Sequence, residues 1–149
     1  MHKLMDKLGR YRLILDRVTK EPYMHRYYLF LKDRKWFPFN VVLHKIVKSD
    51  EPVFHDHPWP FITIVLSGGY WEHTPVLDDN GRQIADITQW RGPGSIIMRG
   101  SKDYHWLELD ENVGPVTTLF FMGPQLREWG FLKDKWIHNE EYLKQRLSK

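Results

Sequence analysis

Three histidines in this sequence have the residue type and spacing needed to hold a metal ion. His55 and His57 are separated by one residue, and His105 follows 48 residues after His57. Side chains alternate along a β-strand, so His55 and His57 project from the same face if they lie on one. Their imidazoles can then converge on one ion, and a third ligand from a distant strand completes the set. Divalent first-row metals accept neutral imidazole, and catalytic sites often combine three protein ligands with open positions for water or substrate.

The composition limits which other chemistry is available. The 149 residues include no cysteine, so disulfides and thiolate ligands are excluded and a transition-metal site must use His, Asp or Glu. The net charge is +3, and Lys and Arg form no cluster interleaved with aromatic residues, which does not favour nucleic-acid binding. No apolar run is long enough to cross a membrane, and the N-terminal residues lack the apolar core of a signal peptide. We therefore expect no membrane partner and a cytoplasmic location.

The elements that must position these histidines are predicted to be short strands. The length suits one domain over residues 1–149 with a substantial core, and the aromatic content of 15% suits pleated surfaces. Turn signals separate short apolar segments, a pattern typical of an all-β sandwich or barrel. The segments are Tyr23–Leu31, Phe39–Val47, Val53–His57, Phe61–Leu66, Tyr70–Val76, Ile84–Trp90, Ser95–Met98, Tyr104–Leu109 and Val116–Met122.

Local signals add one hairpin and two helices to this prediction. Asn80-Gly81 lies between two strand-like runs and predicts a type I′ turn, which needs positive φ at both central positions. A short helix is expected at His2–Leu8. A C-terminal helix is expected over residues 139–147, with Asn139 as its cap and acidic residues in its first turn.

The residues around the histidines resemble the cupin superfamily. The paired histidines match the first cupin motif, and Gly68 or Gly69 falls where its closing glycine belongs. Gly94 matches the start of the second motif, and His105 follows eleven residues later, as that motif requires. The two motifs cover Ser49–Leu109. The resemblance implies an all-β, cupin-type jelly-roll barrel that occupies the whole chain.

The departures from the motifs change the expected ligand set. The glutamate position of the first motif holds Phe61 or Ile62, neither of which can bind metal. The resemblance therefore implies a three-histidine site, as in cysteine-dioxygenase-like cupins, rather than three histidines and a glutamate. Other motif positions are replaced by Ser49, Gly100, Lys102 and Leu109.

Three further stretches resemble a narrower group, the small uncharacterised cupins of bacteria and their phages. These stretches are His55–Trp59, Leu66–Tyr70 and Gly123–Phe131.

Four other residues are candidates for the site. Tyr70 and Glu72 follow the glycine turn with the same strand parity, so both can point into the barrel as catalytic residues, with Glu72 a ligand or general base. A solvent-facing carboxylate is the alternative. Arg99 can bind an anionic substrate through a bidentate contact or form a surface ion pair. His44 can face the interior as a substrate contact, a supporting residue or a fourth ligand, or be an ordinary core histidine.

Some residues near the site are expected to be structural. Asp56 points away from the ligand face if the strand is regular, and Arg127–Trp129 is expected to join the last strand to the tail. The tryptophans, among them Trp36, are expected in the core, in a dimer interface or in the wall of an apolar pocket.

The function expected from these features is that of a metal-binding cupin, a mononuclear, dioxygenase-like enzyme that combines O₂ with a small molecule. Fe(II) is the expected metal, with Ni, Mn or Zn as alternatives. Two other functions stay open: a non-redox isomerase, epimerase or lyase with histidine as general base, and a non-catalytic small-ligand binder. A homodimer formed by strand or hairpin exchange is compatible with so small and aromatic a barrel.

Overall fold

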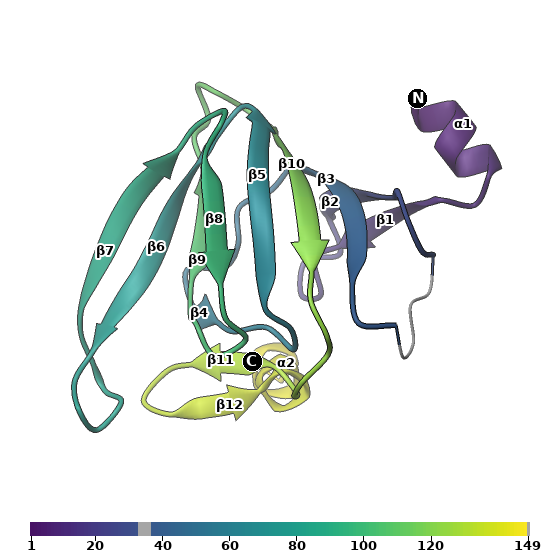
Figure 1. The fold of residues 1–149 in the computed structure, drawn as a ribbon. Helices are drawn as coiled ribbons and strands as arrows, with labels where there is room; N and C mark the ends of the chain where they lie inside the picture. The colour runs from purple at the N-terminus through teal and green to yellow at the C-terminus, as the bar shows by residue number, and fades with distance from the viewer. Residues whose placement is uncertain (33–36, 149) are drawn as a thin grey trace.

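The computed structural model describes residues 1–32 and 37–148, in which short strands dominate (Figure 1). Trp36 lies outside the described residues. Helix α1 (His2–Lys7) precedes the strands and helix α2 (Asn139–Leu147) follows them. The strands are β1 (Tyr11–Leu15), β2 (Pro22–Tyr28), β3 (Asn40–Ile46), β4 (Phe54–His55), β5 (Phe61–Ser67), β6 (Tyr70–Leu77), β7 (Gln83–Arg91), β8 (Ile96–Arg99), β9 (Trp106–Leu109), β10 (Val116–Met122), β11 (Gly130–Leu132) and β12 (Trp136–His138).

The strands form three antiparallel sheets. The largest has the order β1-β2-β3-β10-β5-β8, and the others are β7-β6-β9 and β12-β11-β4. Figure 1 shows the β7-β6-β9 sheet beside the β8–β5 end of the largest sheet, with the β11–β12 hairpin and α2 across one end of both. The predicted all-β architecture is confirmed, and the third sheet brings the tail of the chain to the His55 segment.

The interior is filled by the inward-facing residues of alternating strands. In β3 and β5 the burial alternates residue by residue, as expected for strands with one buried face. One buried apolar cluster includes Val65, Tyr70 and Ile97, and a second includes Val42 and Met122. The first cluster joins β3, β5, β6, β8 and β10, and the partly buried Leu107 and Leu109 of β9, the strand that follows His105, pack against it.

The turn between β6 and β7 differs from the prediction, although the hairpin itself is present. Gly81 has φ of 78°, but Asn80 does not have positive φ, so the turn is not type I′. The Asp78 side chain accepts hydrogen bonds from the backbone N–H groups of Asn80 and Arg82, at 2.9 and 2.8 Å. This side-chain contact closes a longer loop and removes the need for two positive φ angles.

The C-terminal helix has the predicted extent but a different cap. His138, not Asn139, is the N-cap, and its Nδ1 accepts a hydrogen bond from Glu140 N at 3.2 Å. The Asn139 side chain instead bonds Arg17 and the carbonyl of Trp129. Neither helix in the described part of the chain is long and apolar enough to cross a membrane.

Candidate metal centre

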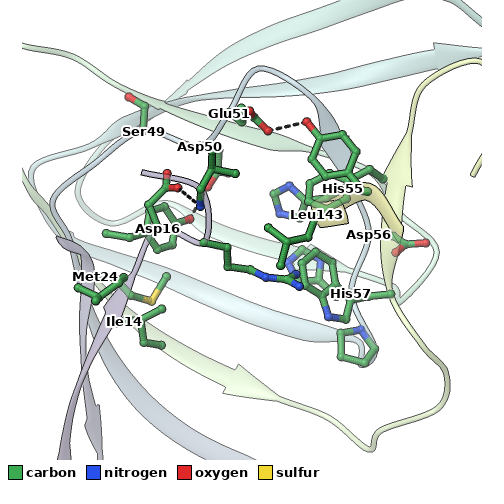
Figure 2. A pocket seen from close by; sticks show the side chains of 18 of the residues that line it. Ile14, Asp16, Met24, Ser49, Asp50, Glu51, His55, Asp56, His57 and Leu143 are labelled. Carbon is green, nitrogen blue, oxygen red and sulfur yellow. Dashed lines mark hydrogen bonds between the residues drawn. The ribbon is translucent and has the colours of Figure 1, made fainter. Parts of the chain in front are cut away.

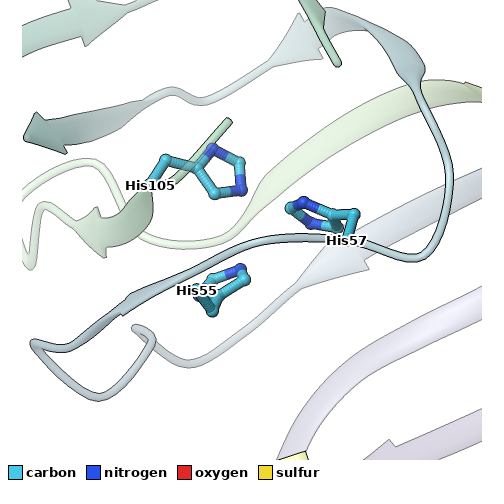
Figure 3. A group of neighbouring side chains, drawn as sticks. All are labelled: His55, His57 and His105. Carbon is cyan, nitrogen blue, oxygen red and sulfur yellow. The ribbon is translucent and has the colours of Figure 1, made fainter. Parts of the chain in front are cut away.

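His55, His57 and His105 converge on one point inside the molecule. Each offers a ring nitrogen, and the three nitrogens lie within 4.8 Å of one another. The ring centroids are 4.9 to 5.1 Å apart. Figure 3 shows the rings pointing toward one another, with His55 and His57 on one segment and His105 on another. Three imidazole nitrogens at this separation can bind a single divalent ion.

Backbone pairing explains why residues so far apart in sequence meet. His55 and His105 form an isolated antiparallel bridge, in which each N–H donates to the other's carbonyl at 3.0 Å. Directly opposed residues in such a pair project their side chains from the same face. His57 lies two residues after His55 and shares that face. Its own N–H donates to the carbonyl of Ser101 at 3.2 Å, which fixes the segment beyond β4.

The surroundings keep two of these imidazoles in the form that binds metal. Burial lowers the pKa of His55 from 6.5 to about 4, and burial also lowers the pKa of His57 well below its usual value. Both are neutral at pH 7, as ligation requires. Phe61 packs against His57, with 4.6 Å between ring centroids. Within the described residues, His57 Nδ1 is buried without a hydrogen-bond partner, an arrangement that a bound ion or ligand would relieve.

His105 is oriented from behind by Glu72. Its Nδ1 lies 2.8 Å from a carboxylate oxygen of Glu72, whose side chain is 1% exposed. Burial raises the pKa of Glu72, but hydrogen bonds from His105 and Arg99 outweigh it and lower the pKa to about 2. An ionised carboxylate accepts the Nδ1–H of His105, which leaves Nε2 as the atom available to a metal.

Two arginines compensate the charge of Glu72. Arg91 donates through Nε and Nη2 at 3.1 and 2.9 Å, and Arg99 donates through the same two atoms at 3.3 and 2.6 Å. Arg99 is expected from the sequence either to contact substrate or to form an ion pair, and in the structure these two donors contact Glu72. Arg91 was not predicted, although it directly faces Tyr70 across the β6–β7 hairpin.

The remaining candidates lie away from the converging nitrogens. Among the residues described, neither His44 nor Glu72 belongs to the group of potential ligands. His44 is 5% exposed, and its Nε2 accepts a hydrogen bond from Nε of Arg26 at 3.0 Å. Tyr70 is 2% exposed within the apolar core, and burial raises the pKa of its hydroxyl.

Asp56, between the two paired histidines, anchors the tail of the chain. It is fully buried and accepts hydrogen bonds from Arg127 Nη1, Gly130 N and Trp136 Nε1 at 2.5, 2.7 and 3.0 Å. The Asp56 side chain therefore contacts β11 and β12, whereas the side chains of His55 and His57 point to the candidate centre. This is the division of roles that strand alternation predicts.

A pocket of about 390 Å³ opens next to the histidines and is lined by His55 and His57. Figure 2 shows these two on one side and Ile14 and Met24 on the other. Its volume falls in the range of small-molecule sites, about 300–1,000 Å³. The other apolar side chains of the wall include Trp59, Trp129, Phe131 and Leu143. The charged ones are Asp16, Arg17, Arg26, Asp50, Glu51 and Asp56.

Comparison with known proteins places the fold. No protein-family model matches the sequence, and no match to it is found among curated proteins. The structure of Fe(II) HppE is similar at a TM-score of 0.55 and 9% identity, over 76% of this chain and 57% of that one. The polyketide cyclase RemF from Streptomyces resistomycificus has a TM-score of 0.54 and 16% identity, over 84% and 82%.

Oxalate decarboxylase from Bacillus subtilis is also similar, with a TM-score of 0.54 and 12% identity, over 89% of this chain and 30% of that one. The chain thus spans little more than half of HppE and less than a third of oxalate decarboxylase. All three neighbours have the cupin fold. The chain has this fold as well, so the cupin-type barrel predicted from the motifs is confirmed.

Proposed function

We propose that the protein is a mononuclear metal-dependent enzyme that uses Fe(II) and O₂ to act on a small molecule. The observation that carries this proposal is the convergence of three histidine nitrogens within 4.8 Å beside a pocket of about 390 Å³. A structural metal site is usually closed by four protein ligands, whereas three ligands leave positions open to substrate or water.

The residues behind the centre have the arrangement expected around a metal ligand. Glu72 fixes the tautomer and ring orientation of His105, as carboxylates behind metal-bound histidines commonly do. Phe61 and Phe131 flank the histidines, with centroids 4.6 Å from His57 and 6.1 Å from His55. These rings limit the access of bulk water to the centre. A bound divalent ion supplies Lewis acidity there, and iron also supplies redox chemistry with O₂.

The donor set is compatible with iron. Three neutral imidazoles and no carboxylate leave the full charge of a divalent ion to attract substrate, and imidazole suits iron as well as Ni and Zn. The fold is shared with a protein solved in its Fe(II) form. Ni, Mn and Zn are the alternatives that metal analysis distinguishes.

The placement of Glu72 and Tyr70 argues against one form of the non-redox alternative, in which these two residues assist a histidine general base. An isomerase or lyase built on these residues needs one of them at the substrate. Neither is among the pocket-lining residues in the described chain, and Glu72 is committed to His105, Arg91 and Arg99. A low pKa of about 2 also makes Glu72 a poor base.

Metal analysis of protein purified without a chelating tag tests the ligand set. We expect about one ion per chain, lost in His55→Ala, His57→Ala and His105→Ala. The matched control is His2→Ala, because His2 lies on α1 outside the converging group. Protein that binds no metal, even after anaerobic reconstitution with Fe(II), would contradict the proposed centre.

Oxygen uptake separates the reaction classes. Fe(II)-loaded protein is mixed with a library of small molecules, and O₂ consumption is followed with an electrode. Substrate-dependent uptake that disappears in His105→Ala supports the oxygenase. Turnover of a library compound without O₂ would favour the isomerase or lyase.

A further inference from the structure

The pocket beside the histidines contains two arginines, Arg17 and Arg26. Among residues 1–32 and 37–148, Arg17 and Arg26 line this pocket and neither forms an ion pair with a carboxylate. Arg17 donates to the neutral amide of Asn139 at 3.2 Å and lies over the ring of Trp129, 5.8 Å from its centroid. Arginines in a largely apolar wall are costly without a counter-charge.

Arg26 is held in place by a buried neutral group. Its Nε donates to Nε2 of His44 at 3.0 Å, and His44 is 5% exposed. A histidine nitrogen that accepts this bond carries no negative charge, so the contact fixes the guanidinium without compensating it. No other described residue accepts a hydrogen bond from the remaining donors of this guanidinium. Carboxylate and phosphoryl groups are the partners whose geometry a guanidinium fork matches best.

Cations lie beside three of the four acidic residues in the pocket wall. Glu51 pairs with Arg146 and Asp56 pairs with Arg127, whereas Asp16 shares Lys48 with Glu21, at 3.1 and 2.7 Å.

The fourth acidic residue, Asp50, has neutral donors: it accepts a hydrogen bond from the Tyr23 hydroxyl and one from Leu107 N at 2.8 Å. Arg17 and Arg26 therefore share the wall with one carboxylate that has no cation, Asp50, and with Asp16, whose cation is shared. The divalent ion of the proposed centre adds positive charge beside these arginines.

We propose that Arg26, supported by Arg17, forms an anion-binding subsite of this pocket, and that the substrate is a small organic acid. Its apolar body packs on the aromatic and aliphatic wall, and its carboxylate or phosphoryl group contacts the guanidinium of Arg26. His44 acts as a positioning residue, because it touches Arg26 and does not line the pocket. This inference rests on the proposed function, since it concerns the substrate of the same centre.

The test compares acids with their neutral amides. Acetate, butyrate and phenylacetate, each beside its primary amide, and phenyl phosphate are titrated into metal-free and Zn²⁺-loaded protein, with binding followed by NMR. We expect at least one acid to bind about 10-fold or more tightly than its amide, the gain expected from a charge-assisted hydrogen bond. The metal-free arm isolates the arginines from the attraction of the ion.

Substitutions of the two arginines test whether they cause the preference for an acid over its amide. Arg26→Gln keeps an amide donor for His44 and should remove most of the preference in metal-free protein. Arg17→Gln is a second variant, less dependent on the core, and should reduce the preference by a smaller factor. Arg82→Gln is the matched control, because Arg82 is exposed in the β6–β7 loop away from the pocket.

The outcomes separate this inference from the proposed function. If Zn²⁺ binds but no acid binds better than its amide, or the preference survives in both pocket variants, the anion subsite is wrong. If the metal-free protein shows an acid preference that Arg26→Gln abolishes, the subsite is supported even if no metal binds.

Discussion

The Nδ1 atom of His105 and a carboxylate oxygen of Glu72 lie 2.8 Å apart, with Glu72 itself held by two arginines. This relationship links the proposed centre to two sheets at once. Glu72 belongs to β6 of the β7-β6-β9 sheet, whereas Arg99 belongs to β8 of the six-stranded sheet. The ion pair therefore joins the sheets behind the histidine that it orients.

Glu72→Gln tests this support. The neutral amide no longer enforces the Nδ1–H tautomer of His105, so we expect metal affinity to fall about 10–100-fold. Leaving two arginines without their carboxylate should also lower the free energy of unfolding by up to about 3 kcal/mol. Metal affinity is measured by competition with a chelating dye, under conditions in which the variant is folded by circular dichroism.

The matched control for Glu72→Gln is Glu108→Gln. Glu108 also bonds a histidine, His73, at 2.8 Å, but that pair lies outside the converging group. Its substitution should leave metal affinity unchanged. Equal affinity in Glu72→Gln and the native protein would show that packing alone orients His105.

Asp56→Asn tests how the tail is held against the histidine segment. Asp56 is fully buried and receives three donors, including the charged Arg127. Removing its charge should lower the free energy of unfolding by about 3 kcal/mol, measured by urea denaturation. Asp86→Asn in the exposed strand β7 is the control and should change stability by less than about 0.5 kcal/mol. A cost below about 1 kcal/mol for Asp56→Asn would mean that packing of Tyr142 on Phe131 holds the tail.

The buried His44 should make the free energy of unfolding decrease at acidic pH. Burial, and then the nearby Arg26, lower the pKa of His44 well below 6.5, so the folded protein keeps it neutral while the unfolded chain binds a proton. Stability from this group is therefore present above pH 6.5 and is lost as the pH falls below it. The His44→Gln variant lacks this titrating group. The difference in free energy of unfolding between the native protein and the variant should therefore decrease by about 1.4 kcal/mol per pH unit below pH 6.5.

The measurement for His44→Gln is the free energy of unfolding in urea between pH 7 and pH 4.5, on metal-free protein. His2→Gln serves as the control for loss of a histidine near the surface. Parallel stability curves for His44→Gln and the native protein would contradict the prediction.

The sequence predicts the three candidate ligands but not the contacts that position them. The spacing of His55 and His57 follows from strand alternation, whereas their meeting with His105 depends on a single long-range bridge. Arg91 could have been found from the hairpin signal. A two-residue turn at Asn80-Gly81 predicts that Tyr70 pairs with Arg91. This pairing is observed, although the register shifts between Val76 and Leu77 and the loop closes through Asp78.

Other features depend on tertiary contacts that leave no local pattern. Strand β1 was not predicted, since its burial does not alternate. His138 caps α2 in place of the predicted Asn139, because the Asn139 side chain is hydrogen-bonded to Arg17 and to the carbonyl of Trp129. Arg17 and Arg26 have no distinguishing sequence context, and only the folded chain places both in one pocket wall.

Gly68, one of the two candidates for the closing glycine of the first motif, allows the cost of backbone conformation to be separated from the cost of steric contact. Gly68 and Gly81 have nearly the same φ, 76° and 78°. A Cβ at Gly68 would meet the carbonyl oxygen of Pro115 and Cα of Val116, whereas a Cβ at Gly81 would meet nothing within 4 Å. Gly81→Ala should cost about 1 kcal/mol for its left-handed conformation.

Gly68→Ala should cost roughly 2 kcal/mol more than Gly81→Ala, because backbone atoms must move to admit the methyl group. Urea denaturation of both variants at pH 7 provides the comparison, and the shared φ makes Gly81→Ala the internal control. Similar losses in the two variants would mean that conformation alone selects glycine at the β5–β6 turn. A larger loss at Gly68 means that the close approach of the segment leading into β10 requires it.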